Sequence, residues 1–365
     1  MCFRHGLTVL LASALAFELW GCATTPVQRG PFVVAATETA SAPLRLSEPA
    51  AAPKIKVLIA RDPNATTAYK PNPDVVRRLV DRAITQFAGQ KTVALAWQSI
   101  VKTQDVVGVK VYSRPGASSG TRPSVVAAVI EGLLASGLPA TNIIIWDKSL
   151  DDLRAAGYMD LGRQYGVRVD SAIQAGYDDA VSYTNPVTKS LVWGDHEFGR
   201  SGEGIGRRSF VSKLITREIT KIVCVSPLLN HNLMGVTGCL ASVALGSVDN
   251  ALRFEDNLDR LAAAVPEIYA MPQVGDHVVL NIMDALICQY AGEQQSLLHY
   301  STVLNQIWVS TDPVALDVLG VQELDRQREV AGLTSPKSPM DLFHNAALLE
   351  IGSDDPRNIK IDLAQ

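Results

Sequence analysis

A histidine follows one of the most apolar segments of the sequence and is surrounded by polar and small residues. His231 lies in "SPLLNHNLMGVTGC", residues 226–239, directly after the run "KIVCV". A neutral imidazole nitrogen can ligate a metal ion, and the ring can transfer protons near neutral pH. Gly235 and Gly238 would let the backbone approach a ligand, and a helix beginning near Thr237 could hold an anionic group at its N-terminus. His231 is therefore a catalytic or metal-binding candidate, and the alternative is a hydrogen-bonded structural histidine.

Aspartates end three further apolar segments. "NIIIWD" ends at Asp147, "VVLNIMD" at Asp284 and "IWVSTD" at Asp312. Because α/β sheets bind ligands beyond the carboxyl ends of their strands, we expect Asp147 and Asp284 to share one crevice with His231. Carboxylates beside one imidazole suit a divalent cation, which makes Asp147, His231 and Asp312 a candidate metal set. For Asp312 the alternative is a helix N-cap, because Pro313 follows it.

Two basic features could bind an anion. Lys110 interrupts the apolar run "DVVGVKVY", either as an edge-strand lysine with its ammonium in water or as a lysine of the same crevice, where desolvation would lower its pKa. The glycine-rich stretch "GRSGEGIGRRSF", residues 199–210, contains Arg207. It lacks the flanking strand and helix of a dinucleotide-binding fingerprint, but it could be a mobile loop that closes over an anionic ligand.

Alternating strands and helices must position these side chains. We predict strands at 54–60, 105–112, 142–147, 221–226, 277–283 and 306–310, and helices at 73–87, 122–137, 237–247, 256–270 and 313–327. Residues 180–194 are typical of a hairpin around Asn185 and Pro186. Nearly continuous apolar strands are buried on both sides, so we expect an α/β fold with a mixed, mainly parallel sheet, helices on both faces and a hairpin insertion.

The N-terminus has the pattern of an exported lipoprotein. A basic Arg4, an apolar stretch and "LWGC" are typical of a secretory signal with a lipobox, in which Cys22 would be acylated. The alternatives are a plain cleaved signal and an uncleaved anchor. Residues 23–53 are rich in Ala, Thr, Pro and Ser and are expected to form a disordered tether. We thus predict a single α/β domain at 54–365, lipid-anchored in the bacterial cell envelope and facing the periplasm.

Composition and cysteine spacing exclude two classes of function. The chain has 33 basic and 37 acidic residues without a basic cluster, so no nucleic-acid partner is expected. Its cysteines lack the C-x-x-C spacing that helps four thiolates hold an iron–sulfur cluster, and no such cluster is expected. Cys224, Cys239 and Cys288 are predicted to be free, buried thiols.

Several motifs in this order resemble a known family. The chain resembles the bacterial and archaeal family called domain of unknown function 362 over roughly residues 73–325. The motifs that carry this resemblance are "VGVKVY", "GTRPSVVAAVIEGLLASGL", "IIIWD", "KIVCVSPLLNHNLMGVTGCLASV", "VVLNIMDAL" and "VSTDPVALDVLG". The resemblance implies functional roles for Lys110, His231, Thr237, Gly238, Asp284, Asp312 and Asp317. Arg122 stands where the family usually has histidine, and Leu229-Asn230 replaces more basic residues. Many relatives also carry a ferredoxin-like insert of clustered cysteines, which this chain lacks.

Three functions fit these features. The first is an exported, membrane-tethered enzyme acting on a small anionic substrate, with or without a divalent metal. Its candidate catalytic residues are Lys110, His231 and Asp284, and its candidate substrate-binding residues are Arg122, Asn230, Thr237, Gly238 and Arg207. The second is a non-catalytic lipoprotein that binds a small molecule or a metal, for which a cavity lined by neutral groups would be expected. The third, a structural envelope protein, predicts no cavity at the strand ends.

Overall fold

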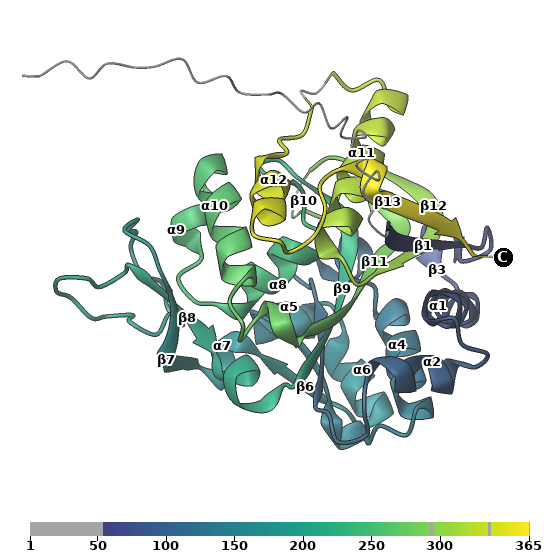
Figure 1. The fold of residues 1–365 in the computed structure, drawn as a ribbon, viewed down its shortest axis with the longest axis horizontal. Coiled ribbons are helices and arrows are strands. Elements are labelled where there is room, and N and C mark those ends of the chain that lie inside the picture. The colour runs from purple at the N-terminus through teal and green to yellow at the C-terminus, as the bar shows by residue number, and fades with distance from the viewer. Residues whose placement is uncertain (1–53, 293–294, 335–336, 365) are drawn as a thin grey trace, which may run out of the picture. The chain divides into compact units, whose positions relative to one another are not determined.

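A computed structural model describes residues 54–292, 295–334 and 337–364 (Figure 1). The predicted signal peptide, the lipobox cysteine Cys22 and the predicted tether lie outside these residues. Within the described ranges, none of the helices is long and apolar enough to cross a membrane.

The main sheet of the described residues has nine strands. Its order is β13-β1-β12-β11-β9-β4-β5-β6, with β10 paired to β9. These strands are β1 (Ile55–Arg61), β4 (Val107–Val111), β5 (Ile143–Asp147), β6 (Arg168–Ser171), β9 (Lys221–His231), β10 (Gly235–Val236), β11 (Val278–Gln289), β12 (Ser301–Ser310) and β13 (Ile359–Leu363). From β11 to β6 all neighbours are parallel, whereas β12 is antiparallel to both of its neighbours. The expected mixed, mainly parallel sheet is confirmed.

Helices cover both faces of this sheet (Figure 1). One face, here the α4 face, packs against α1 (Pro73–Ala88), α2 (Val93–Ile100), α4 (Pro123–Ala135), α5 (Leu150–Ala155) and α6 (Tyr158–Tyr165). The other, here the α8 face, packs against α8 (Cys239–Ser247), α10 (Leu258–Tyr269), α11 (Pro313–Val330) and α12 (Asp341–Leu348). In β5, Ile143 and Ile145 belong to the first core, and Ile144 and Trp146 to the second. This period of two buries both faces of each central strand.

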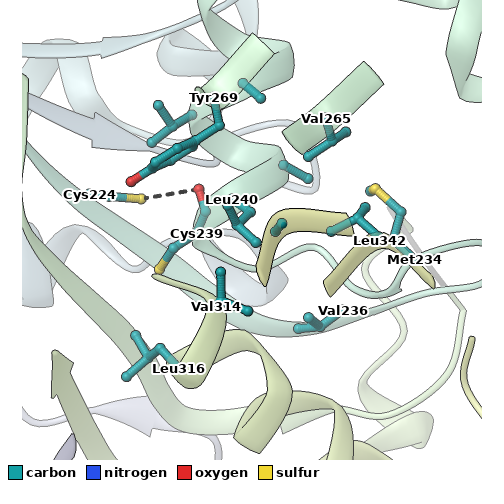
Figure 2. Packing of buried hydrophobic residues seen from close by; sticks show 14 of the residues in the cluster. Cys224, Met234, Val236, Cys239, Leu240, Val265, Tyr269, Val314, Leu316 and Leu342 are labelled. Carbon is teal, nitrogen blue, oxygen red and sulfur yellow. Dashed lines mark hydrogen bonds between the residues drawn. The ribbon is translucent and has the colours of Figure 1, made fainter. Parts of the chain in front are cut away.

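Helix α8 is buried on nearly all sides. Its residue Leu240 lies in a cluster with Tyr269 and Val265 of α10 and with Val314 of α11 (Figure 2). The Sγ atom of Cys224 in β9 lies 4.0 Å from the Cys239 carbonyl oxygen. Cys224, Cys239 and Cys288 are buried free thiols, as expected. This packing fixes α8 beside β9, where the sequence places its candidate residues.

The remaining elements are short. They are β2 (Thr66–Thr67), β3 (Lys70–Pro71), α3 (Gly116–Ser119), α7 (Ala172–Ala175), β7 (Tyr177–Thr184), β8 (Arg208–Ser212) and α9 (Leu252–Glu255). The predicted helix 256–270 begins later, at α10, because the side chain of Asn257 caps it by accepting a hydrogen bond from the Arg260 amide, 2.9 Å. The chain bends there between α9 and α10.

The predicted hairpin at 180–194 is wrong. Strand β7 pairs with β8 instead, and residues 185–207 form a long connecting loop. The loop closes because the buried Arg253 guanidinium donates to the carbonyls of Asn185, Val187 and Arg207. Residues 187–194 form no strand, and all of them are exposed or only partly buried.

Candidate functional site

A cavity of about 190 Å³, here the inner cavity, opens at the carboxyl ends of β4 and β5 and beside α8. Four of the candidate residues line it: Lys110, Asp147, His231 and Thr237. The other candidates inferred from the sequence, Arg122, Arg207, Asn230, Gly238, Asp284, Asp312 and Asp317, do not line it. A cavity at this edge is what the ligand-binding hypotheses predict and the purely structural hypothesis does not.

Lys110 is fully buried in a central strand, so the alternative of an edge lysine in water is wrong. Its ammonium donates to Asp147 Oδ1 at 2.9 Å, to the Val111 carbonyl at 2.7 Å and to Ser242 Oγ at 3.0 Å. An ammonium has three N–H donors, so all of them are used inside the protein. Lys110 therefore fixes Asp147 and leaves no donor for a ligand.

Asp147 is held from both sides of its carboxylate. Oδ2 accepts hydrogen bonds from the Ser113 amide and hydroxyl, each 2.7 Å, and Oδ1 also accepts one from the Lys148 amide, 2.8 Å. These bonds fix the loops that follow β4 and β5. Asp147 thus shapes the rim of the inner cavity.

His231 ends β9 and is nearly buried. Its Nδ1 accepts hydrogen bonds from the amides of Leu233 and Met234, each 3.3 Å, which places the proton of a neutral ring on Nε2. A tight turn makes this possible, since Gly235 has φ 79° and pairs back onto His231. The ring is thereby held at one orientation in the lining of the cavity.

Thr237 supplies a hydroxyl that lacks a partner. The residue is 2% exposed, and its Oγ1 has no hydrogen-bond partner among the residues that the structure describes. Buried hydroxyls almost always have a partner, because desolvation without one is unfavourable. A ligand or water in the inner cavity can satisfy this hydroxyl.

The N-terminus of α8 does not receive a ligand as expected. Asp317 of α11 accepts hydrogen bonds from the amides of Cys239 at 2.7 Å and Leu240 at 2.9 Å. A Cβ atom at Gly238 would lie 2.3 Å from that carboxylate, so Gly238 makes room for Asp317 rather than for a substrate. Burial raises the pKa of Asp317 to about 7. Asp317 is therefore a capping residue from a distant helix.

Asp284 belongs to a different ion pair, so its expected place in the crevice is wrong. Its Oδ1 lies 3.0 Å from Arg122 Nη1, and its Oδ2 accepts a hydrogen bond from the Arg122 amide, 3.0 Å. Arg122 also donates to the carbonyls of Ser118 and Ile287. The neighbouring Met283 belongs to the core of the α8 face, and strand alternation turns Asp284 to the α4 face. Arg122 and Asp284 thus tie α4 to β11.

Three other candidates also have contacts elsewhere. Asn230 Oδ1 accepts a hydrogen bond from Arg328 Nη1, 2.6 Å, and Arg207 is exposed at the end of the long loop. Asp312 caps α11 by accepting from the Ala315 amide at 2.8 Å. Capping, the alternative stated for Asp312, accounts for its position.

The expected metal set is not assembled. Asp147 is engaged by Lys110, and Asp312 is a helix cap that does not line the cavity. In the described part of the chain, no group of three or more His, Cys, Asp or Glu side chains is arranged to hold a metal ion. The residues present do not fit a divalent cation at this site.

Several charged residues of the cavity were not predicted from the sequence. Arg114, Lys148 and Glu255 line the cavity together with Asp152. Lys148 directly follows β5, and Arg114 lies a few residues beyond β4, so the first positions after each strand were the available signal. Glu255, from α9, carried no such signal.

Lys148 has an unusual environment. It is partly buried, and its Nζ donates a long hydrogen bond of 3.4 Å to the Leu245 carbonyl. Burial lowers its pKa, and the carboxylates of Glu255, Asp195, Asp249 and Asp147 oppose this effect. For Asp152, burial and the charge of Asp147 raise the pKa. A lysine that releases its proton more easily than usual thus lies beside carboxylates.

The fold and this site define an α/β protein with a charged cavity at the carboxyl ends of its central strands. The family model described as domain of unknown function (DUF362) matches residues 106–322, more than half of the chain, and the protein belongs to this family. Among solved structures, the crystal structure of a Thermotoga maritima protein, a structural genomics target, is similar over 72% of this chain and 60% of that chain, with 10% identity and a TM-score of 0.39. No curated protein matches the sequence.

Proposed function

We propose that the inner cavity is the active site of an enzyme that binds the anionic group of a small substrate. The observation that carries this proposal is a pair of cations at one cavity. Arg114 and Lys148 both line it, and neither forms an ion pair within residues 54–292, 295–334 and 337–364. Arg114 is exposed and Lys148 is partly buried, and a cation without an ion-pair partner beside a cavity can bind an anion, to which the Thr237 hydroxyl can also donate.

Two residues of the same cavity, Lys148 and Glu255, can transfer protons. Lys148 has a lowered pKa, and Glu255 is the carboxylate that acts on it most strongly. A group with a shifted pKa beside an oppositely charged group in a cavity is a candidate acid or base. The His231 imidazole lines the same cavity. We assign proton transfer to Lys148 and Glu255, and we treat Lys110 as a positioning residue because its three donors hold neighbouring groups.

Anion binding to the purified protein tests the proposal. Calorimetry with inorganic phosphate and acetate is compared for the wild type, Lys148→Gln, Lys148→Arg and the exposed control Lys91→Gln. Loss of one charge-assisted hydrogen bond predicts roughly 10- to 100-fold weaker binding for Lys148→Gln. Lys91→Gln should bind like the wild type.

The pH dependence of anion binding separates the effect of the Lys148 charge from that of the Lys148 side-chain shape. Because the pKa of Lys148 is lowered, its charge and the anion affinity should fall at a lower pH than for an ordinary lysine. Lys148→Arg keeps its charge and should retain binding at alkaline pH. Equal affinity of wild type and Lys148→Gln for both anions would overturn the proposal. Binding that depends on Lys148 without a shift of its pKa toward neutrality would instead favour a non-catalytic binding protein.

We also propose that the protein is tethered to a membrane of the cell envelope through acylated Cys22. The support is the "LWGC" motif and the polar, small-residue segment that follows it. An acyl chain on this residue supplies membrane affinity that the α/β domain need not provide. Cys22→Ser should move the protein from the membrane fraction to the soluble fraction, and intact-protein mass spectrometry should show loss of the lipid. An unchanged membrane fraction would contradict the tether.

A further inference from the structure

A second cavity of about 160 Å³ adjoins the first and is here called the outer cavity. The two cavities share Arg114, Lys148, Ile173 and Glu255, so one ligand can reach from one into the other past the unpaired cations. The residues that line the outer cavity alone include the aromatic Tyr177 and Trp193, the apolar Val192 and Leu252, and the acidic Asp195. The outer cavity therefore has two aromatic side chains in its own lining.

Tyr177 places a buried hydroxyl in the lining of the outer cavity. The residue is 3% exposed, and its Oη has no hydrogen-bond partner among the described residues. A phenol that is buried without a partner loses the hydrogen bonds it had with water. Tyr177 lines the outer cavity, so a polar group of a ligand that reaches this hydroxyl would restore a hydrogen bond that the described residues do not supply.

Trp193 also lines the outer cavity, but unlike Tyr177 it is exposed. Its side chain is 78% exposed, and its neighbour Val192 is 43% exposed. The turn that presents the indole is held in place, because the Asp195 carboxylate accepts hydrogen bonds from the Val192 amide at 2.9 Å and the Asn250 amide at 2.8 Å. An exposed indole on an anchored turn beside a cavity is a surface on which a planar ring can stack.

We propose that the outer cavity binds the aromatic ring of the ligand whose anionic group lies in the inner cavity. The ring stacks on Trp193, and a polar ring substituent bonds to Tyr177. The ligand class is a hydroxyaryl-substituted carboxylate or a molecule of equivalent shape and charge. The anionic half of this assignment rests on the proposed function, whereas the aromatic half rests on the outer cavity alone.

Four small ligands test the anionic half and the aromatic half of this assignment separately. Acetate reports on the inner cavity, the neutral 4-methylphenol on the outer cavity, and phenylacetate and 4-hydroxyphenylacetate on both. Affinities are measured by calorimetry for the wild type, Trp193→Ser and Tyr177→Phe. Phe198→Ser is the matched control, since Phe198 is 50% exposed on the same loop and does not line either cavity.

In the wild type, 4-hydroxyphenylacetate should bind more tightly than acetate. Trp193→Ser should weaken 4-methylphenol and both aromatic acids by roughly three- to ten-fold and leave acetate unchanged. Tyr177→Phe should weaken 4-hydroxyphenylacetate and 4-methylphenol by roughly three- to ten-fold without affecting phenylacetate. Phe198→Ser should change none of these affinities. Trp193 is largely exposed and the Tyr177 hydroxyl has no described partner, so both variants should retain the fold.

Two outcomes distinguish failure of the outer-cavity assignment from failure of the proposed function. Unchanged affinity of Trp193→Ser and Tyr177→Phe for 4-methylphenol and for the aromatic acids would overturn the outer-cavity assignment, whatever acetate does. Acetate binding that is absent or independent of Lys148, with 4-methylphenol still sensitive to Trp193 and Tyr177, would overturn the proposed function and support the aromatic site alone.

Discussion

Two buried ion pairs involve central strands of the sheet. Lys110 and Asp147 lie at the carboxyl ends of β4 and β5, whereas Asp284 lies inside β11 and its partner Arg122 directly precedes α4. Lys110 and Asp147 are 2.9 Å apart and border the inner cavity, whereas Arg122 and Asp284 are 3.0 Å apart and do not. The Asp147 side chain is 8% exposed, and the Asp284 side chain is 0% exposed. The first pair borders the inner cavity, and the second fastens α4 to β11.

A charged residue that follows an apolar run is therefore not by itself a functional residue. Both aspartates follow such a run in the sequence, but only Asp147 ends its strand, because β11 continues past Asp284 to Gln289. Strand alternation turns Asp284 to the α4 face, where Arg122 at the start of α4 covers it, whereas Asp147, the last residue of β5, binds the Lys110 ammonium. The cavity lies where loops after β4 and β5 diverge beside α8, whereas the start of α4 closes the site over Asp284.

Removing the closed pair should have the largest effect. Asp284→Ala leaves the Arg122 guanidinium buried and uncompensated, and it should lower the free energy of unfolding by about 3–5 kcal/mol. Urea denaturation measures this loss. The double replacement Arg122→Met with Asp284→Leu should recover part of it, because apolar residues do not leave an unpaired charge. A loss below about 1 kcal/mol would contradict the burial of the Arg122–Asp284 pair, because an exposed ion pair contributes no more than that to the free energy of unfolding.

Breaking the cavity pair should have a smaller effect on stability and an additional effect on binding. Lys110→Met should lower the free energy of unfolding by about 2–3 kcal/mol, below the usual range for a fully buried pair, because Asp147 keeps its bonds to Ser113 and Lys148. The matched readout is phosphate affinity, which should fall for Lys110→Met but not for folded Asp284→Ala. A greater destabilisation by Lys110→Met than by Asp284→Ala would reverse the comparison.

The sequence predicts the layers of the fold well, because the spacing of apolar residues along the chain reflects which side chains are buried. The pattern places α4 at Pro123 and ends β5 at Asp147, and the structure agrees. It also brings Lys110 and His231 to one cavity through the rule for strand ends. Periodicity assigns Asp284 to the α4 face, but it does not show that the start of α4 covers this carboxylate, because α4 is distant in sequence.

Other features depend on contacts between distant segments. Asp317 caps α8 from a separate helix, and Arg253 closes the loop between β7 and β8. Neither partner has a local signal, so the predicted anion site and the predicted hairpin fail for the same reason. Lys148 and Glu255 acquire their roles from burial and proximity, which one sequence does not give.

The smallest effect should occur at a third aspartate, which follows β12 and binds backbone amides rather than a cation. Asp312 accepts hydrogen bonds from the amides of Ala315 at 2.8 Å and Ser353 at 3.0 Å. Asp312→Ala should lower the free energy of unfolding by about 1 kcal/mol, the usual contribution of an N-cap. Asp312→Asn should remain close to the wild type, because asparagine caps a helix as well as aspartate does.

The pH dependence of that small difference tests its physical cause. Burial raises the pKa of Asp312, so the folded protein binds its proton more tightly than the unfolded chain does. The stability contributed by this proton is present below the ordinary pKa and is lost as pH rises through the folded value. Asparagine does not titrate, so the stability of Asp312→Asn relative to the wild type should improve from about pH 4 to about pH 7 in urea denaturation. A relative decline over the same interval would show that the ionised carboxylate, rather than its capping geometry, stabilises this strand end, which would make Asp312 resemble the charged pairs instead of differing from them.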